Sequence, residues 1–139
     1  MMQIEELPAD LHAEIARGHE TNRVEFKAAL GRDGRGQVPE SVYETVSAFA
    51  NRLGGNIYFG VDDAGRVLGI NAAHVARMRA AFTAVVTSAK FQPGMSLSVN
   101  AYQLDNRIVL QVHVPQSKQI VRYNNQKYVR RDDADIVVK

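Results

Sequence analysis

The sequence contains no cysteine. The chain therefore cannot form a disulfide, a thiolate zinc site or a thiol nucleophile, and the absence is consistent with a reducing cytoplasm. No apolar run approaches the roughly 20 residues that a helix needs to cross a bilayer. The stretch from Met1 to Leu11 also lacks the basic-then-apolar layout of a signal peptide. We therefore expect a soluble, cytoplasmic protein with no membrane partner.

Charge is balanced overall but unevenly distributed. The 17 Lys and Arg residues against 15 Asp and Glu residues give a net charge of only +2, which by itself indicates no particular partner. Between residues 118 and 131, however, basic side chains occur without any acidic one: Lys118, Arg122, Lys127, Arg130 and Arg131. Such a run is compatible with a face that binds a polyanion and equally with a solvated surface hairpin.

The apolar pattern predicts one α+β domain over residues 1–139. Helical spacing occurs in residues 10–17, 39–53 and 71–89, with Gly54-Gly55 ending the second segment and Asn71 capping the third. Alternation predicts strands at residues 24–27, 57–61, 66–70, 97–101, 108–114, 120–123 and 128–131. We expect a mixed or antiparallel sheet with two long helices packed on it. The apolar end, Val137-Val138, suggests a domain cut from a longer chain.

Three stretches together resemble the Schlafen-type AlbA-like domain found in bacterial transcriptional regulators. They are Glu20–Lys27 (ETNRVEFK), Val46–Asp63 (VSAFANRLGGNIYFGVDD, with Gly65 and Gly69 following) and Tyr128–Arg130. The resemblance spans about residues 18 to 133. It implies an α+β fold and binding of nucleic acid, either DNA or RNA, and related folds often form homodimers. Within the middle stretch we expect mainly structural roles, with Asn51 bonding either the backbone of the glycine turn or a phosphate.

The resemblance also implies a second function, because some Schlafen relatives are metal-dependent nucleases with three acidic residues. By position these fall on Glu20, Glu25 and Asp62. Carboxylates brought together at strand ends could hold Mg²⁺ or Mn²⁺, whereas without that activity we expect no cofactor. The alternative is that Asp62 forms a turn and that Glu25 pairs with a basic neighbour such as Lys27 or Arg23.

The leading hypothesis is a non-catalytic nucleic-acid-binding domain of a transcriptional-regulator-like protein. Basic groups neutralise phosphates, and tyrosines can stack on exposed bases. The predicted contacts are a basic C-terminal hairpin, a glycine-rich loop and one strand residue: Arg122, Lys127, Tyr128, Arg130, Arg131, Arg32, Arg35 and Lys27. A charged edge that prevents aggregation is the alternative for the hairpin, and a dimerisation or protein-interaction module is the third function considered.

Overall fold

The computed structural model describes residues 4–31 and 36–139, and it confirms the α+β class. It has three α-helices, α1 (Ala9–Ala16), α2 (Val42–Ala50) and α3 (Val75–Val86), and a short 3-10 helix η1 (Ala72–His74) before α3. The Asn71 side chain caps this segment, as predicted, by accepting a hydrogen bond from the Ala73 N–H at 2.9 Å. Only α3 is long, so the expectation of two long helices is slightly wrong.

The first sheet is mixed and has the order β1-β5-β6-β3-β2. Its strands are β1 (Glu5–Glu6), β2 (Val24–Lys27), β3 (Gly55–Phe59), β5 (Val99–Leu104) and β6 (Arg107–Val114). The β1–β5 and β2–β3 pairs are parallel, and the remaining pairs are antiparallel. This order makes β2 an edge strand, a position that matters for the site described below.

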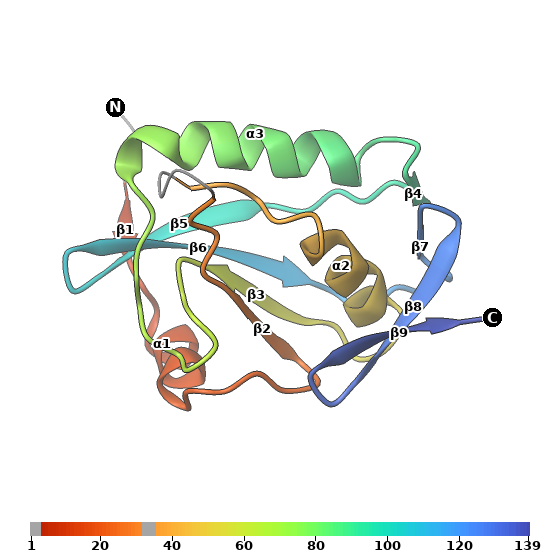
Figure 1. The fold of residues 1–139 in the computed structure, drawn as a ribbon, viewed down its shortest axis with the longest axis horizontal. Coiled ribbons are helices and arrows are strands. Elements are labelled where there is room, and N and C mark those ends of the chain that lie inside the picture. Colours follow the sequence, from red (N-terminus) through yellow and green to blue (C-terminus); the bar gives the residue numbers. More distant parts are fainter. Residues whose placement is uncertain (1–3, 32–35) are drawn as a thin grey trace.

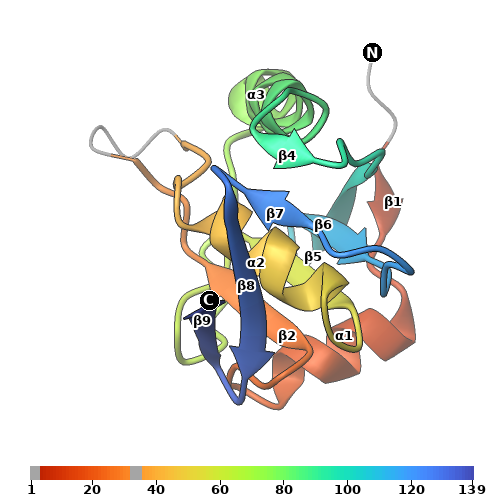
Figure 2. The ribbon, with the colours of Figure 1, turned by 90° about the vertical axis from the view of Figure 1, so that its right-hand side faces the viewer.

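The second sheet is antiparallel and has the order β4-β7-β8-β9. Its strands are β4 (Phe91–Gln92), β7 (Arg122–Tyr123), β8 (Gln126–Arg131) and β9 (Ala134–Val138). Figure 2 shows α2 between this sheet and the first one. The second sheet therefore acts as an outer layer over α2 rather than as an extension of the first sheet.

Side-chain alternation in the first sheet gives each face its own core. On the face covered by α2 and α3, Ile57 and Leu110 pack with Phe82. On the opposite face, Tyr58 and Phe26 pack against α1. Figure 1 shows α3 and α1 on opposite sides of the sheet.

Two tight turns join strands of the sheets, and one predicted strand is wrong. Asp105-Asn106 and Asn124-Asn125 all have positive φ, between 49° and 66°, as two-residue hairpin turns require. Residues 66–70 do not form a strand, and only a single bridge joins Val61 to Val67. The N–H groups of Leu68 and Gly69 both donate to the Gly60 carbonyl oxygen instead, which curls the chain away from a ladder.

Three short strands were not predicted from the sequence. β1 and β4 are only two residues long. β9 has a burial pattern without clear alternation, because its side chains are exposed or half-buried throughout. Within the described residues, no helix combines the length and the apolar character needed to span a membrane.

Candidate functional site

The register of the β7–β8 hairpin divides the basic run between two faces. Arg122 lies directly opposite Lys127 in this hairpin. Side chains alternate along β8, so Lys127 and Arg131 share one face, whereas Tyr128 and Arg130 share the other. The face of the second sheet that packs on α2 is called the inner face below, and the solvent side is called the outer face.

Arg130 lies on the inner face, is only 2% exposed and is surrounded by charge. Its Nη2 donates to Glu25 Oε2 at 2.6 Å, and its Nη1 donates to Asp135 Oδ1 at 2.8 Å. The other Glu25 oxygen pairs with Lys27 Nζ at 3.1 Å. Burial alone would lower the pKa of Arg130, but the charges of Glu25 and Asp135 outweigh it and raise that pKa. Two positive and two negative groups thus compensate one another.

The same guanidinium also covers the free edge of β2. Arg130 donates to the Thr21 carbonyl oxygen from Nε and Nη2, at 3.2 and 3.1 Å, and to the Val24 carbonyl oxygen at 3.1 Å. Its Cζ lies 5.0 Å from the centre of the Phe49 ring, a cation–π distance. Arg130 therefore joins the second sheet to the first. The prediction that it contacts nucleic acid is wrong, because its side chain does not reach the surface.

Glu20 also contacts the edge strand β2, by accepting a hydrogen bond from a backbone N–H group. Its Oε2 accepts a hydrogen bond at 3.0 Å from the Phe26 N–H, which belongs to the edge strand β2. Burial is the largest of the causes that raise the pKa of Glu20 to about 7, and the neighbouring charge of Glu25 adds to it. The hydrogen bond from Phe26 acts in the opposite direction. Glu20 and Glu25 are thus two interacting carboxyl groups at one strand edge.

Asp62, the third acid of the predicted trio, organises its own turn. Its Oδ1 accepts hydrogen bonds from the N–H groups of Ala64 and Arg66, at 3.0 and 2.9 Å, and its Oδ2 accepts one from Arg66 Nε at 2.9 Å. The hydrogen bonds, chiefly the one from the Arg66 backbone, lower the pKa of Asp62. The alternative prediction, that Asp62 forms a turn, is confirmed.

These three acids do not fit a divalent ion in the observed arrangement. Glu25 commits its two oxygens to Lys27 and Arg130, and Asp62 commits both of its oxygens to its own turn. Across residues 4–31 and 36–139, no group of three His, Asp or Glu side chains is placed to hold a metal ion. A hard cation needs several oxygen ligands at once. Metal-dependent cleavage therefore stays a prediction from the family resemblance.

Asn51 and Ser47 attach α2 to the second sheet. Asn51 Nδ2 donates to the carbonyl oxygens of Val121 and Tyr128, both at 2.8 Å, and Oδ1 accepts from the Val121 N–H at 2.8 Å. Ser47 Oγ donates to the Val121 carbonyl at 2.8 Å and accepts from the Tyr128 N–H at 3.2 Å. The structural role expected for this stretch is confirmed, but the two partners expected for Asn51 are wrong, because its amide joins two separate segments of the outer layer.

Tyr128 is buried with the core of the inner face, where it is 7% exposed. Its hydroxyl donates to Gln126 Oε1 at 2.9 Å. A ring in this position has no open face for a base, so the predicted stacking role is wrong.

The outer face retains three of the predicted basic residues. Arg122 and Arg131 are exposed and Lys127 is half-buried. Val129 and Ile136 are paired across β8 and β9, and they add half-buried apolar surface between the charges. Sequence reasoning missed this apolar contribution because β9 itself was not predicted.

Lys27 and the glycine-rich loop complete the predicted set. Lys27 Nζ donates to Ser41 Oγ at 3.0 Å and pairs with Glu25, so its charge is compensated inside the protein. Arg32 and Arg35 lie outside the described residues, and their proposed contacts stay predictions.

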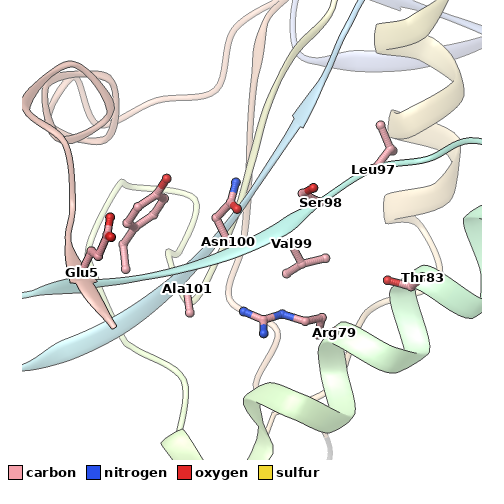
Figure 3. A pocket seen from close by; sticks show the side chains of 9 residues that line it. Glu5, Arg79, Thr83, Leu97, Ser98, Val99, Asn100 and Ala101 are labelled. Atoms are coloured by element: carbon pink, nitrogen blue, oxygen red, sulfur yellow. The ribbon is translucent and has the colours of Figure 1, made fainter. Parts of the chain in front are cut away.

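A separate hollow of about 580 Å³ lies between α3 and β5 (Figure 3). Arg79 extends from α3 toward β5, and its Nε is buried without a hydrogen-bond partner in the described part of the chain. Glu5, Ser98 and Asn100 also line this hollow. None of the predicted site residues contributes to it.

Comparison with known proteins agrees with the fold. The sequence model of the family described as "Schlafen, AlbA_2" matches residues 20–138, which extends the predicted match through β9. No curated protein matches the chain.

Two solved structures share the fold. The DIP2311 protein from Corynebacterium diphtheriae has a TM-score of 0.65 and 18% identity, over 94% of this chain and 26% of that one. The N-terminal domain of a protein related to the ATP-dependent DNA helicase RecG, from Nitrosomonas europaea, has a TM-score of 0.56 and 23% identity, over 83% of this chain and 74% of that one. The chain thus spans about a quarter of the length of DIP2311, and at these identities the likeness concerns the fold alone.

Proposed function

This chain belongs to the Schlafen, AlbA_2 family, and from that premise we propose that it is a nucleic-acid-binding domain whose outer face contacts phosphates. The observation that carries the proposal is the register of β7 and β8, which gathers Arg122, Lys127 and Arg131 on the solvent side. The fold shared with the N-terminal domain of a DNA-helicase-related protein supports it.

One acid of the second sheet, Asp135, is directed away from the outer face. Asp135 turns toward the inner face, where its Oδ1 meets Arg130 and its Oδ2 accepts a hydrogen bond from Thr45 Oγ1 at 2.5 Å. The arginines of the outer face therefore meet a phosphate backbone without competition from that carboxylate. Such contacts position a nucleic acid and carry little sequence information, so the proposed domain has weak sequence preference. Arg32 and Arg35 are proposed as additional phosphate contacts.

Salt-dependent binding tests this function. Fluorescence anisotropy with a labelled DNA duplex, between 50 and 200 mM salt, gives the slope of log affinity against log salt. The Arg122→Ala/Arg131→Ala variant is expected to lower affinity and to reduce the slope by about 0.9 for each arginine removed. A matched variant, Arg66→Ala/Arg107→Ala, removes two exposed arginines from another part of the molecule and is expected to retain binding.

Comparing these two double variants also shows which results would contradict the proposal. Equal loss of affinity in both variants would mean that net charge matters and the outer face does not. Binding that does not weaken as salt rises would contradict a phosphate interface altogether.

A second candidate, a metal-dependent nuclease, is favoured by one observation, the pair of interacting carboxyl groups. A perturbed pKa such as that of Glu20 is frequent at catalytic sites but also occurs in structural clusters. Structured RNA incubated with Mn²⁺ tests it, with Glu20→Gln as the variant because glutamine can still accept the hydrogen bond from Phe26. Products that require metal and disappear in this folded variant would support cleavage, whereas intact RNA would remove the candidate.

A further inference from the structure

A polar groove lies where α1, the segment before β2 and the end of β6 meet. We propose that this groove binds a phosphate group through Arg17, Arg23 and His113. Its volume is about 420 Å³, and it shares no lining residue with the outer face of the second sheet. The proposal therefore goes beyond the proposed function and does not depend on it.

A directed chain of hydrogen bonds supports the floor of the groove. Asn100 Nδ2 donates to Gln111 Oε1 at 3.0 Å, and Gln111 Nε2 donates to Asn56 Oδ1 at 2.9 Å. Asn56 Nδ2 then donates to Glu14 Oε1 at 2.9 Å, and Tyr58 Oη donates to the same oxygen at 2.6 Å. A carboxylate can only accept, so Glu14 sets the orientation of the Asn56 amide and, through it, of the chain.

This orientation fixes the tautomer of His113. Its Nδ1 lies 3.0 Å from Asn56 Oδ1, an oxygen that accepts and cannot donate, so Nδ1 carries the hydrogen. The imidazole is exposed, and Nε2 is the nitrogen left for a ligand. Against a phosphate, a charged imidazolium donates from Nε2, and a neutral ring accepts from a protonated phosphate oxygen.

The same hydrogen bonds engage one oxygen of Glu14, which is itself a lining residue of the groove. Arg17 follows Glu14 by three residues, a spacing at which helical side chains commonly meet. Glu14 Oε1 is held by Asn56 and Tyr58. Burial, followed by the hydrogen bond to Glu14 and its charge, raises the pKa of Tyr58, so this hydroxyl remains protonated and continues to donate.

Arg17 and Arg23 line the same groove as Glu14 and His113. Neither Arg17 nor Arg23 takes part in an ion pair within residues 4–31 and 36–139. Planar guanidinium groups bind phosphate oxygens through paired, charge-assisted hydrogen bonds. Two of them beside an oriented imidazole suit a tetrahedral anion with several acceptors. The ligand class is thus a phosphate, either free, at the end of a nucleic acid or within its backbone.

An NMR titration of the ¹⁵N-labelled chain with inorganic phosphate tests the site directly. The His113 imidazole and the side-chain Nε signals of Arg17 and Arg23 are expected to shift together. The Arg17→Ala/Arg23→Ala variant should weaken binding about tenfold or more, because it removes two charge-assisted contacts. Arg66→Ala/Arg107→Ala should leave binding unchanged.

Short oligonucleotides with and without a 5′-phosphate identify the source of the ligand. Preference for the phosphorylated oligonucleotide assigns the groove to a chain end, and equal binding assigns it to the backbone. Unchanged phosphate affinity in Arg17→Ala/Arg23→Ala overturns the proposal. The Arg122→Ala/Arg131→Ala variant should bind inorganic phosphate like the parent. The phosphate titration therefore tests the groove even if the outer face does not bind nucleic acid.

Discussion

Arg130 and Arg131 are adjacent in the sequence, and their environments are opposite. Arg130 is 2% exposed and pairs with Glu25 and Asp135 behind the second sheet. Arg131 is exposed on the outer face. The strand alternation of β8 separates the two, because neighbouring side chains point to opposite sides of a sheet. One arginine is thus part of the fold, whereas the other is available to a partner.

This difference shows why a count of basic residues overstates a binding surface. Half of a basic strand can face inward when buried carboxylates are present to compensate it, as Glu25 and Asp135 do here. Charge that is compensated inside the protein attracts no polyanion. Beside an edge strand such as β2, a long guanidinium can donate to several carbonyl oxygens at once.

The largest expected effect comes from exchanging each of these two arginines for methionine. Arg130→Met leaves Glu25 and Asp135 without their main partner, and breaking a buried pair in this way costs about 3–5 kcal/mol. Arg131→Met should change the free energy of unfolding by no more than about 0.5 kcal/mol. Urea unfolding of the two variants and the parent measures both values. Similar values for the two variants would break the comparison, because they would mean that Arg130 is no more structural than its neighbour.

The sequence alone predicts most of the helices and strands, but it predicts only part of the separation of β8 side chains between the inner and outer faces. The helix around Val46 and Phe49 and the strand around Ile57 follow from apolar spacing, and the family resemblance follows from the long middle stretch. That Tyr128 and Arg130 share a face was also predictable from alternation. Which face is buried was not, because the answer depends on β9 and on Glu25, a residue 105 positions away from Arg130.

The candidate site was less predictable for the same reason. Glu20 and Glu25 are near each other in sequence and in space, whereas the turn around Asp62 satisfies that carboxylate locally. Arg17, Arg23 and His113 gave no sequence signal, since they come from three separate segments that only the sheet topology assembles. Asn51 lies in a recognisable motif, but its partners come from the second sheet.

An intermediate effect is expected where α2 holds the inner face in place. Asn51→Ala removes three hydrogen bonds to Val121 and Tyr128 and leaves buried backbone groups unpaired. We expect the free energy of unfolding to fall by about 2–3 kcal/mol, because a buried backbone group without a hydrogen-bond partner is costly. Asn22→Ala, at an exposed asparagine, is the matched control and should be close to neutral. Urea unfolding measures the difference, and equal stability of the two variants would show that Asn51 does not dock the second sheet.

The smallest effect concerns the dependence of stability on pH. It distinguishes Glu20, at the edge of β2, from Arg131 on the outer face. The pKa of Glu20 is raised from 4.5 to about 7 in the folded protein, so the folded state binds the proton more tightly. Its contribution to stability is therefore complete below the unfolded pKa and is lost as the pH rises through about 7. Glutamine at this position keeps an acceptor for Phe26 and removes the titration.

Between pH 5 and pH 8, the stability of Glu20→Gln relative to the parent should rise by about 1 kcal/mol, a value reduced for solvent screening at this half-buried group. Taking the difference between the two proteins cancels the contributions of groups that the substitution does not affect. Arg131→Met should show no such change, because Arg131 is exposed on the outer face and makes no contact with Glu20. Parallel pH profiles for Glu20→Gln and the parent would mean that the Glu20 carboxyl group is not held at the edge of β2 beside Glu25.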